Sequence, residues 1–239
     1  MDLLAVKKFL LDYLFPIFCV GCQKEGEWWC ENCLKKDFRG GQFSCPLCHL
    51  PTSAGRPCAV CAPHSFLDGV AAFYEYHDQK PIGGLIKNFK YQLATDIVSV
   101  WEVVSKLYLD LIFRQAIYFN QSYLLLPIPL HYKREAERGF NQAQMIAETF
   151  LKFLPKSEFD VRHQVLSRIK NTPKQSQLSK EERQKNILGA FEYRGLPLNN
   201  QSIILVDDVY TTGATMQECA RVLKNNGAKA VYGLALARG

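Results

Sequence analysis

The chain has 239 residues, of which 48% are hydrophobic and 22% are charged. This composition excludes a largely disordered chain and suffices for one sizeable core with a small appended module. The formal net charge of +6 favours anionic partners such as phosphates or nucleic acids only weakly, because a solvated basic surface explains it equally well.

Residues 1–16 predict a short amphipathic helix that Pro16 stops. The apolar residues that fall on one face of it are Leu3, Val6, Leu10 and Leu14. We expect this helix to dock on its own chain, and a membrane-surface or partner helix is the alternative. Charges interrupt the apolar run, which argues against a secretion signal, and no stretch is long enough for a transmembrane helix. We therefore expect a reducing, cytoplasmic location.

Residues 17–63 contain four Cys-x-x-Cys pairs. The pairs are Cys19 with Cys22, Cys30 with Cys33, Cys45 with Cys48, and Cys58 with Cys61. Each pair is a turn that aims two thiolates at one point, and two turns supply the tetrahedral sulfur shell of a structural zinc. A segment this short cannot bury a large hydrophobic core, so it needs a metal ion of this kind to stabilise its fold. We therefore predict a double zinc ribbon with two closed, structural Zn²⁺ sites.

Two groupings of these pairs are open. Neighbouring pairs close smaller loops at lower entropic cost, which favours one ion on the first two pairs and one on the last two. The alternative is an interleaved arrangement in which the first and third pairs share an ion. The ninth cysteine, Cys219, falls in a predicted helix, and we expect it to be a buried apolar residue.

Aromatic and basic side chains lie between the cysteine pairs. They are Trp28, Trp29, Lys35, Lys36, Phe38 and Arg39. Such a mixture can stack on unpaired bases while it tracks the phosphates of single-stranded nucleic acid. Packing of the two tryptophans against the neighbouring domain is the simpler interpretation, and we favour it.

Residues 64–239 alternate strands with helices, which predicts a parallel sheet flanked by helices. The predicted strands are 70–76, 123–126, 203–206 and 231–237. The predicted helices are 81–101 and beyond, 141–154 with Asn141 as N-cap, and 214–225 with Gly227 as C-terminal cap. The polar stretch 169–186 lacks periodicity, and a long loop inside a compact domain is typical of a mobile functional loop.

The segment 203–215 carries the strongest functional signal. An apolar strand delivers Asp207 and Asp208, and a hydroxyl-rich loop then opens a helix through Thr211, Thr212, Gly213, Ala214 and Thr215. The N–H groups and hydroxyls of this loop can surround a phosphate at the helix N-terminus. Carboxylates repel phosphate, so the two aspartates must face something else, and sugar hydroxyls fit. The residues therefore predict a site for a ribose 5-phosphate.

This segment resembles the motif with which type I phosphoribosyltransferases bind phosphoribosyl pyrophosphate (PRPP). Further segments narrow the resemblance, namely Pro127-Ile128-Pro129-Leu130-His131, Arg134, Arg138-Gly139-Phe140-Asn141-Gln142-Ala143, Leu166-Ser167-Arg168 and Gly189-Ala190-Phe191. Together with the cysteine module, they are similar to the ComF family of bacterial competence and DNA-utilisation proteins over essentially the whole chain.

The resemblance implies a type I phosphoribosyltransferase fold, with PRPP on Asp207, Asp208 and residues 211–215. Mg²⁺ would bridge pyrophosphate and ribose oxygens. The turn 127–131 would lie against the pyrophosphate, and the loop 169–186 would close over PRPP. The candidate charge partners on the turn and the loop are Arg134, Arg138, Arg168 and Lys174. A surface basic cluster is the alternative for the arginines of the turn.

The resemblance also implies a role in natural transformation or in the use of imported single-stranded DNA, beside a helicase-like partner. Catalysis would displace pyrophosphate at the anomeric carbon, mainly through positioning and charge stabilisation. No general base stands out, and no nucleobase-recognition segment is evident near the C-terminus, so the sequence leaves open whether the chain is an enzyme. The alternatives are a salvage or amido-type phosphoribosyltransferase, and a zinc-ribbon nucleic-acid binder on a transferase scaffold.

Overall fold

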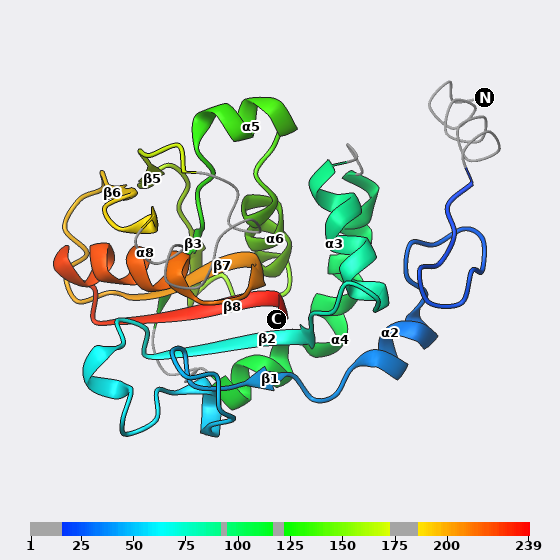
Figure 1. Ribbon diagram of the computed structural model, residues 1–239, viewed down its shortest axis with the longest axis horizontal. Coiled ribbons are helices and arrows are strands. Elements are labelled where there is room, and N and C mark those ends of the chain that lie inside the picture. Colours follow the sequence, from blue (N-terminus) through cyan, green and yellow to red (C-terminus); the bar gives the residue numbers. More distant parts are fainter. Residues whose placement is uncertain (1–15, 92–94, 117–121, 173–185) are drawn as a thin grey trace.

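The computed structural model describes residues 16–91, 95–116, 122–172 and 186–239, and a six-stranded sheet lies at its centre (Figure 1). The strands, in spatial order, are β1 (Gln42–Phe43), β2 (Gly69–Glu75), β8 (Ala230–Arg238), β7 (Ser202–Tyr210), β3 (Tyr123–Pro127) and β4 (Phe159–Val161). All neighbours are parallel except β1 and β2, which are antiparallel. The predicted α/β fold with a parallel sheet is therefore confirmed.

Helices cover both faces of this sheet. On one face α3 (Pro81–Tyr91), α4 (Val98–Ala116) and α6 (Gln142–Leu151) form a core, and on the other α8 (Ala214–Asn225) does so. Figure 1 shows α8 in front of the strands and α6 behind them. Ile204 and Val206 of β7 enter the first core, whereas Ile203 and Leu205 enter the second. Because both faces are buried, this strand is a continuous apolar run rather than an alternating one.

Several smaller elements complete the fold. An antiparallel pair, β5 (Leu166–Arg168) and β6 (Phe191–Tyr193), packs against α8. The short helices α2 (Glu31–Asp37) and α5 (Tyr132–Arg138) and the 3-10 turns η1 (Ser53–Gly55), η2 (Ala62–His64) and η3 (Thr95–Ile97) lie between the longer elements. Among the described residues, no helix combines the length and the apolar character needed to cross a bilayer. Most of the predicted helix 1–16 and most of the predicted loop 169–186 fall outside the described residues.

The structure refines several sequence predictions. The helix predicted over 214–225 coincides with α8, and Asn141 caps α6 as predicted, because its Oδ1 accepts a hydrogen bond from the N–H of Ala143 at 3.0 Å. The single helix expected from residue 81 is two helices, α3 and α4. Strand β7 extends to Tyr210, so the two aspartates lie within it rather than after its end.

The tryptophans of the cysteine module belong to the core. Trp29 is only 2% exposed, and its ring centroid lies 4.9 Å from that of Tyr74 on β2. Trp28 is partly buried against the same core, and Phe38 stacks on Tyr108 of α4 with ring centroids 3.6 Å apart. The packing interpretation is therefore confirmed for Trp29, which is not accessible to an unpaired base. Cys219 is fully buried in α8, also as predicted.

Candidate functional site

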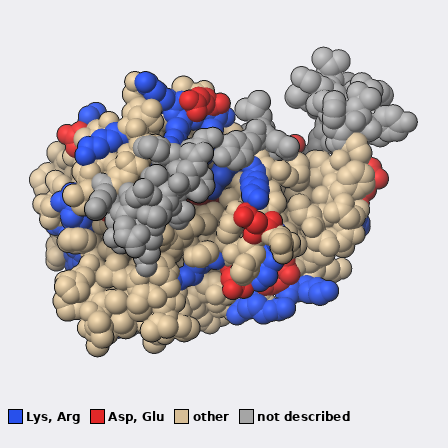
Figure 2. Space-filling model, in the orientation of Figure 1, with Lys and Arg blue, Asp and Glu red and all other residues tan. Residues whose placement is uncertain are grey.

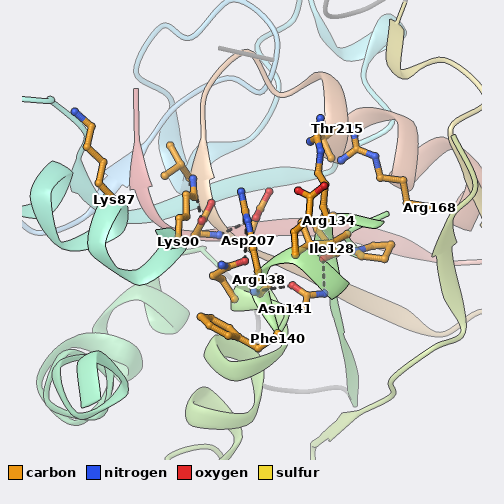
Figure 3. Close-up of a pocket in the computed structure, with 18 of the residues that line it drawn as sticks. Lys87, Lys90, Ile128, Arg134, Arg138, Phe140, Asn141, Arg168, Asp207 and Thr215 are labelled. Carbon is orange, nitrogen blue, oxygen red and sulfur yellow. Dashed lines mark hydrogen bonds and ion pairs between the residues drawn. The ribbon is translucent and has the colours of Figure 1, made fainter. Parts of the chain in front are cut away.

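A cleft of about 1090 Å³ opens at the carboxyl ends of β3 and β7. Ligands of parallel α/β sheets bind at this edge. Its walls come from the end of β7, from α3, from residues 128–143 and from the end of β5 (Figure 3). Its cations are Lys87, Lys90, Arg134, Arg138 and Arg168, and its acids are Asp78, Glu137, Asp207 and Asp208. In Figure 2, Lys and Arg side chains gather over α5, with acidic side chains beside them.

The loop between β7 and α8 forms a second, smaller hollow of about 50 Å³. Asp207 and residues 209–216 line it. Gly213 is the N-cap residue of α8 and has φ of 75°, a left-handed conformation that glycine adopts at little cost. The hollow therefore lies at the N-terminus of a 12-residue helix, where the helix dipole and the N–H groups of the first turn favour an anion.

Of the two aspartates of β7, Asp207 lines both the cleft and this hollow, and Asp208 lines the cleft. The backbone N–H of Asp208 donates a hydrogen bond of 2.8 Å to Oδ1 of Asp207. Burial, followed by the neighbouring charge of Asp208, raises the pKa of Asp207 to about 7, and Lys90 opposes this rise. With a pKa near neutrality, the charge of Asp207 is sensitive to the charges and hydrogen-bond donors placed beside it.

Helix α3 supplies a cation that the sequence did not reveal. Nζ of Lys90 lies 3.0 Å from Oδ2 of Asp208, so the acidic pair is partly neutralised from across the cleft (Figure 3). Lys87 lies one turn earlier on the same helix and also lines the cleft. The only sequence signal is the spacing of three between the two lysines, which puts them on one face of a helix.

The turn after β3 forms the opposite wall and is held by one side chain. Nδ2 of Asn141 donates to the carbonyl oxygen of Ile128 at 3.1 Å, while Oδ1 of Asn141 caps α6. Arg138 donates to Oε1 of Gln142 at 3.0 Å, and Arg134 donates to the carbonyl oxygen of Thr172. The structure thus brings both predicted arginines to the cleft, beside a turn that a buried asparagine fixes.

Arg168 closes a third side of the cleft from the end of β5. Its Nη2 donates to Oγ1 of Thr172, and its guanidinium carbon lies 5.6 Å from the centroid of the Phe191 ring. Burial, and then the charge of Arg134, lowers the pKa of Arg168. Both arginines thus meet at Thr172, the last described residue before 173–185. The remaining predicted cation, Lys174, lies outside the described residues.

The eight paired cysteines form two groups with sequential pairing. The groups are Cys19, Cys22, Cys30 and Cys33, and Cys45, Cys48, Cys58 and Cys61. In each group all four sulfur atoms lie within 4.8 Å of one another, which rules out the interleaved arrangement. This spacing and donor set fit a tetrahedral metal ion such as zinc.

Backbone N–H groups prepare these sulfurs for a metal. Those of Gly21 and Cys30 each lie 3.4 Å from Sγ of Cys19, and that of Cys58 lies 3.5 Å from Sγ of Cys45. Burial opposes ionisation, yet such N–H donors prevail and lower the pKa of Cys19 and Cys45 to about 6. Each group thus holds a thiolate-forming cysteine, and both groups can bind a metal.

The sheet, the acidic pair before a phosphate-type loop, and the two four-cysteine groups define a type I phosphoribosyltransferase fold with an N-terminal double zinc-ribbon module. A family model described as phosphoribosyl transferase domain matches residues 137–238. The chain is 31% identical to competence protein ComFC of Bacillus subtilis over 212 residues, which cover 83% of this chain and 78% of that protein.

Two further relatives are similar at the same level of identity. DNA utilization protein YhgH of Escherichia coli K12 is 30% identical over 220 residues, covering 89% of this chain and 92% of the relative. Competence protein F of Haemophilus influenzae is 30% identical over 168 residues, covering 68% and 70%. The chain therefore belongs to the ComF family of competence and DNA-utilisation proteins, as its motifs indicated.

Proposed function

We propose that this protein binds PRPP with Mg²⁺ in the cleft and acts in the use of imported DNA. The observation that carries the proposal is the juxtaposition of an acidic pair and an anion-binding loop at the end of β7. One ribose 5-phosphate satisfies both, because its hydroxyls donate to carboxylates while its phosphate needs N–H and hydroxyl donors.

The 5′-phosphate would occupy the small hollow, surrounded by Thr211, Thr212, Gly213, Ala214 and Thr215. Asp207 and Asp208 would accept hydrogen bonds from the ribose hydroxyls. A hydroxyl donor stabilises the ionised form of a carboxylate, so ribose would lower the raised pKa of Asp207 and bind best when that group is charged. The positive charge of Lys90 would compensate one of the two negative charges when both aspartates are ionised.

The pyrophosphate would lie across the cleft against the turn at Ile128, with Arg134 and Arg138 as its charge partners. Mg²⁺ bound with the ligand would neutralise part of the pyrophosphate charge while keeping several of its waters. Arg168 and Lys174 would add further positive charge around the pyrophosphate. Each of these cations except Lys174 lines the cleft, which supports this orientation of the ligand.

The match to the phosphoribosyl transferase domain favours a second candidate, a salvage or amido-type phosphoribosyltransferase. Such an enzyme releases pyrophosphate when its acceptor, a small base or amine, attacks the anomeric carbon. Pyrophosphate release measured with a panel of bases and amines distinguishes the two candidates. Strong stimulation by one compound would favour the transferase, and uniform slow release would favour a PRPP-binding role in DNA use.

We further propose that each four-cysteine group holds one structural Zn²⁺ and that single-stranded DNA is a partner, with a helicase-like protein acting beside it in the cytoplasm. The names of the relatives, the net charge of +6 and the exposed Lys35, Lys36 and Arg39 around α2 support the DNA partner. Binding to a labelled oligothymidylate should weaken steeply with added salt. Absence of binding at low salt would contradict direct DNA contact.

Calorimetric titration with PRPP and Mg²⁺ tests the binding proposal. The double variant Asp207→Ala with Asp208→Ala should lose at least about 100-fold in affinity, since it removes two charged acceptors. Asp160→Ala is the matched control, because Asp160 lies on β4, outside the residues that line the cleft. The four-cysteine groups should stay intact in both proteins, and unchanged PRPP affinity in the double variant would contradict the proposed site.

A further inference from the structure

The second four-cysteine group contacts the strand that carries the phosphate loop. The hydroxyl of Tyr210, the last residue of β7, donates a hydrogen bond of 2.7 Å to the carbonyl oxygen of Pro46. Pro46 lies within the Cys45–Cys48 turn, and Tyr210 immediately precedes the phosphate loop. Tyr210 is 2% exposed, so its hydroxyl and this carbonyl depend on each other for a partner in the described structure.

Gly213 packs directly on this hydrogen bond. A Cβ atom placed on Gly213 would overlap the hydroxyl of Tyr210 and would lie 3.1 Å from the carbonyl oxygen of Pro46. The phosphate loop therefore rests on the Cys45–Cys48 turn with no space between them. A displacement of that turn must move the tyrosine hydroxyl, the glycine, or both, because close-packed groups transmit strain.

Further contacts attach the same module to the end of β8 and to α8. Nδ1 of His49 lies 2.7 Å from Nη2 of Arg238, whose guanidinium carbon is 5.5 Å from the Tyr210 ring centroid. Beyond the last cysteine, the N–H of Phe66 donates to Oε1 of Gln217 at 2.9 Å, and Nε2 of Gln217 donates to Oγ of Ser65 at 3.1 Å.

Gln217 lies in the first turns of α8, and its own N–H donates to the carbonyl oxygen of Gly213 at 2.9 Å. Contacts to the loop and to the start of α8 thus come from within the second four-cysteine group and from the residues just after it. The first four-cysteine group differs, because the neighbouring Trp29 packs on Tyr74 of β2 within the first core. Only the second group is joined to the phosphate loop by the contacts described.

We propose that the hydrogen bond from Tyr210 to Pro46 couples metal occupancy of the second cysteine group to ligand affinity of the phosphate loop. This inference rests on the proposed function of that loop. A bound metal fixes the Cys45–Cys48 turn, the turn fixes the Pro46 carbonyl, and Tyr210 then holds Gly213 in place. Tyr210 is a positioning residue, since it acts through the loop. Because coupling is reciprocal, a ligand in the loop must strengthen metal binding at this group.

Zinc release from the unmodified full-length protein tests this reciprocity without any substitution. A chromogenic chelator draws out the two ions, with ribose 5-phosphate as the ligand so that no Mg²⁺ competes for the chelator. We expect ribose 5-phosphate to slow the release of one ion by about fivefold or more and to leave the other unchanged. If saturating ribose 5-phosphate leaves the release rates of both zinc ions unchanged, the proposed coupling is wrong.

Tyr210→Phe removes only the hydroxyl and keeps the ring. We expect about three- to tenfold weaker ribose 5-phosphate binding, with loss of the protection of zinc and two zinc ions still bound. Tyr193→Phe is the matched control, because the Tyr193 hydroxyl also donates to a backbone carbonyl, that of Leu196, at 2.7 Å, outside the cleft. A melting curve verifies that both variants are folded.

The outcomes separate the two proposals. If the unmodified protein does not bind ribose 5-phosphate, the proposed function fails and the coupling fails with it. If the unmodified protein binds and Tyr210→Phe binds equally well with unchanged zinc release, the coupling alone is wrong. Weaker binding and lost protection in Tyr210→Phe but not in Tyr193→Phe would support it.

Discussion

Lys90 of α3 and Asp208 of β7 form an ion pair across the cleft, with 3.0 Å between Nζ and Oδ2. Their side chains are 25% and 10% exposed, so water screens the pair only partly. The charge of Lys90 also acts on Asp207, whose pKa it lowers against the effects of burial and of Asp208. Helix α3 is thereby part of the electrostatics of a site whose strongest sequence signature lies on β7 and the loop that follows it.

Replacing Lys90 with methionine should shift the pH dependence of PRPP binding. Without the lysine, the pKa of Asp207 rises further, so ligand binding should require a higher pH than in the unmodified protein. Calorimetry with PRPP and Mg²⁺ from about pH 6 to pH 9 gives the midpoint. Lys80→Met is the control, since Lys80 pairs with Glu75 at 2.7 Å outside the cleft lining. Equal midpoints in all three proteins would contradict the role of Lys90.

Asp207→Asn should weaken ligand binding and yet stabilise the fold at alkaline pH. The folded protein keeps a proton on Asp207 up to about pH 7, whereas the ordinary pKa is 3.8, so stability falls as pH rises between these values. Asparagine cannot ionise, so the variant does not lose this stability as the pH rises. We expect the melting temperature to rise by about 2 °C or more at pH 8 and to stay the same near pH 4. Calorimetry gives the melting temperatures. An equal difference between Asp207→Asn and the unmodified protein at pH 4 and pH 8 would contradict the raised pKa.

Gly213→Ala should abolish most binding of ribose 5-phosphate. A methyl group there overlaps the Tyr210 hydroxyl, and φ of 75° is strained for alanine. Gly227→Ala provides a control with the same type of strain, because Gly227 has φ of 89° but its nearest neighbouring atom would be 3.8 Å away. We expect affinity to fall by at least about tenfold in Gly213→Ala only. Equal affinities in a calorimetric titration would be inconsistent with the tight packing of this loop.

Local patterns in the sequence predicted much of this architecture. The four Cys-x-x-Cys turns, the apolar run before Asp207 and the helix that begins at Ala214 each depend on a few consecutive residues, and all are in place. Asn141 was predicted as an N-cap for the same reason. Its second role, in fixing the carbonyl of Ile128, was not foreseen, because that contact depends on how β3 and α6 pack.

Contacts between distant segments were not predictable from such patterns. The hydrogen bond of Tyr210 to Pro46 spans 164 residues, and neither residue type signals a partner. Lys90 gave no sign of facing Asp208, because lysines on helices usually face solvent. The burial of Trp29 against Tyr74 likewise depends on the docking of the cysteine module on β2 and α4, which the spacing of the cysteines does not specify.

The metal content of cysteine variants tests the two proposed zinc sites separately from ligand binding. Cys48→Ser removes one of four sulfurs from the second group and should lower zinc from about two ions per chain to about one. Cys219→Ser should keep both ions, although a buried hydroxyl costs about 1–3 kcal/mol of stability. Elemental analysis gives the count. Zinc absent from the unmodified protein, or equal in both variants, would contradict the assignment.

The position of bound PRPP is the most direct test of the proposed function. A crystal structure of the protein with PRPP and Mg²⁺ should place the ribose hydroxyls on Asp207 and Asp208, with the 5′-phosphate inside the loop of residues 211–215. The pyrophosphate should face Arg134 and Arg138. PRPP bound elsewhere, or a cleft that stays empty at saturating PRPP, would contradict the account.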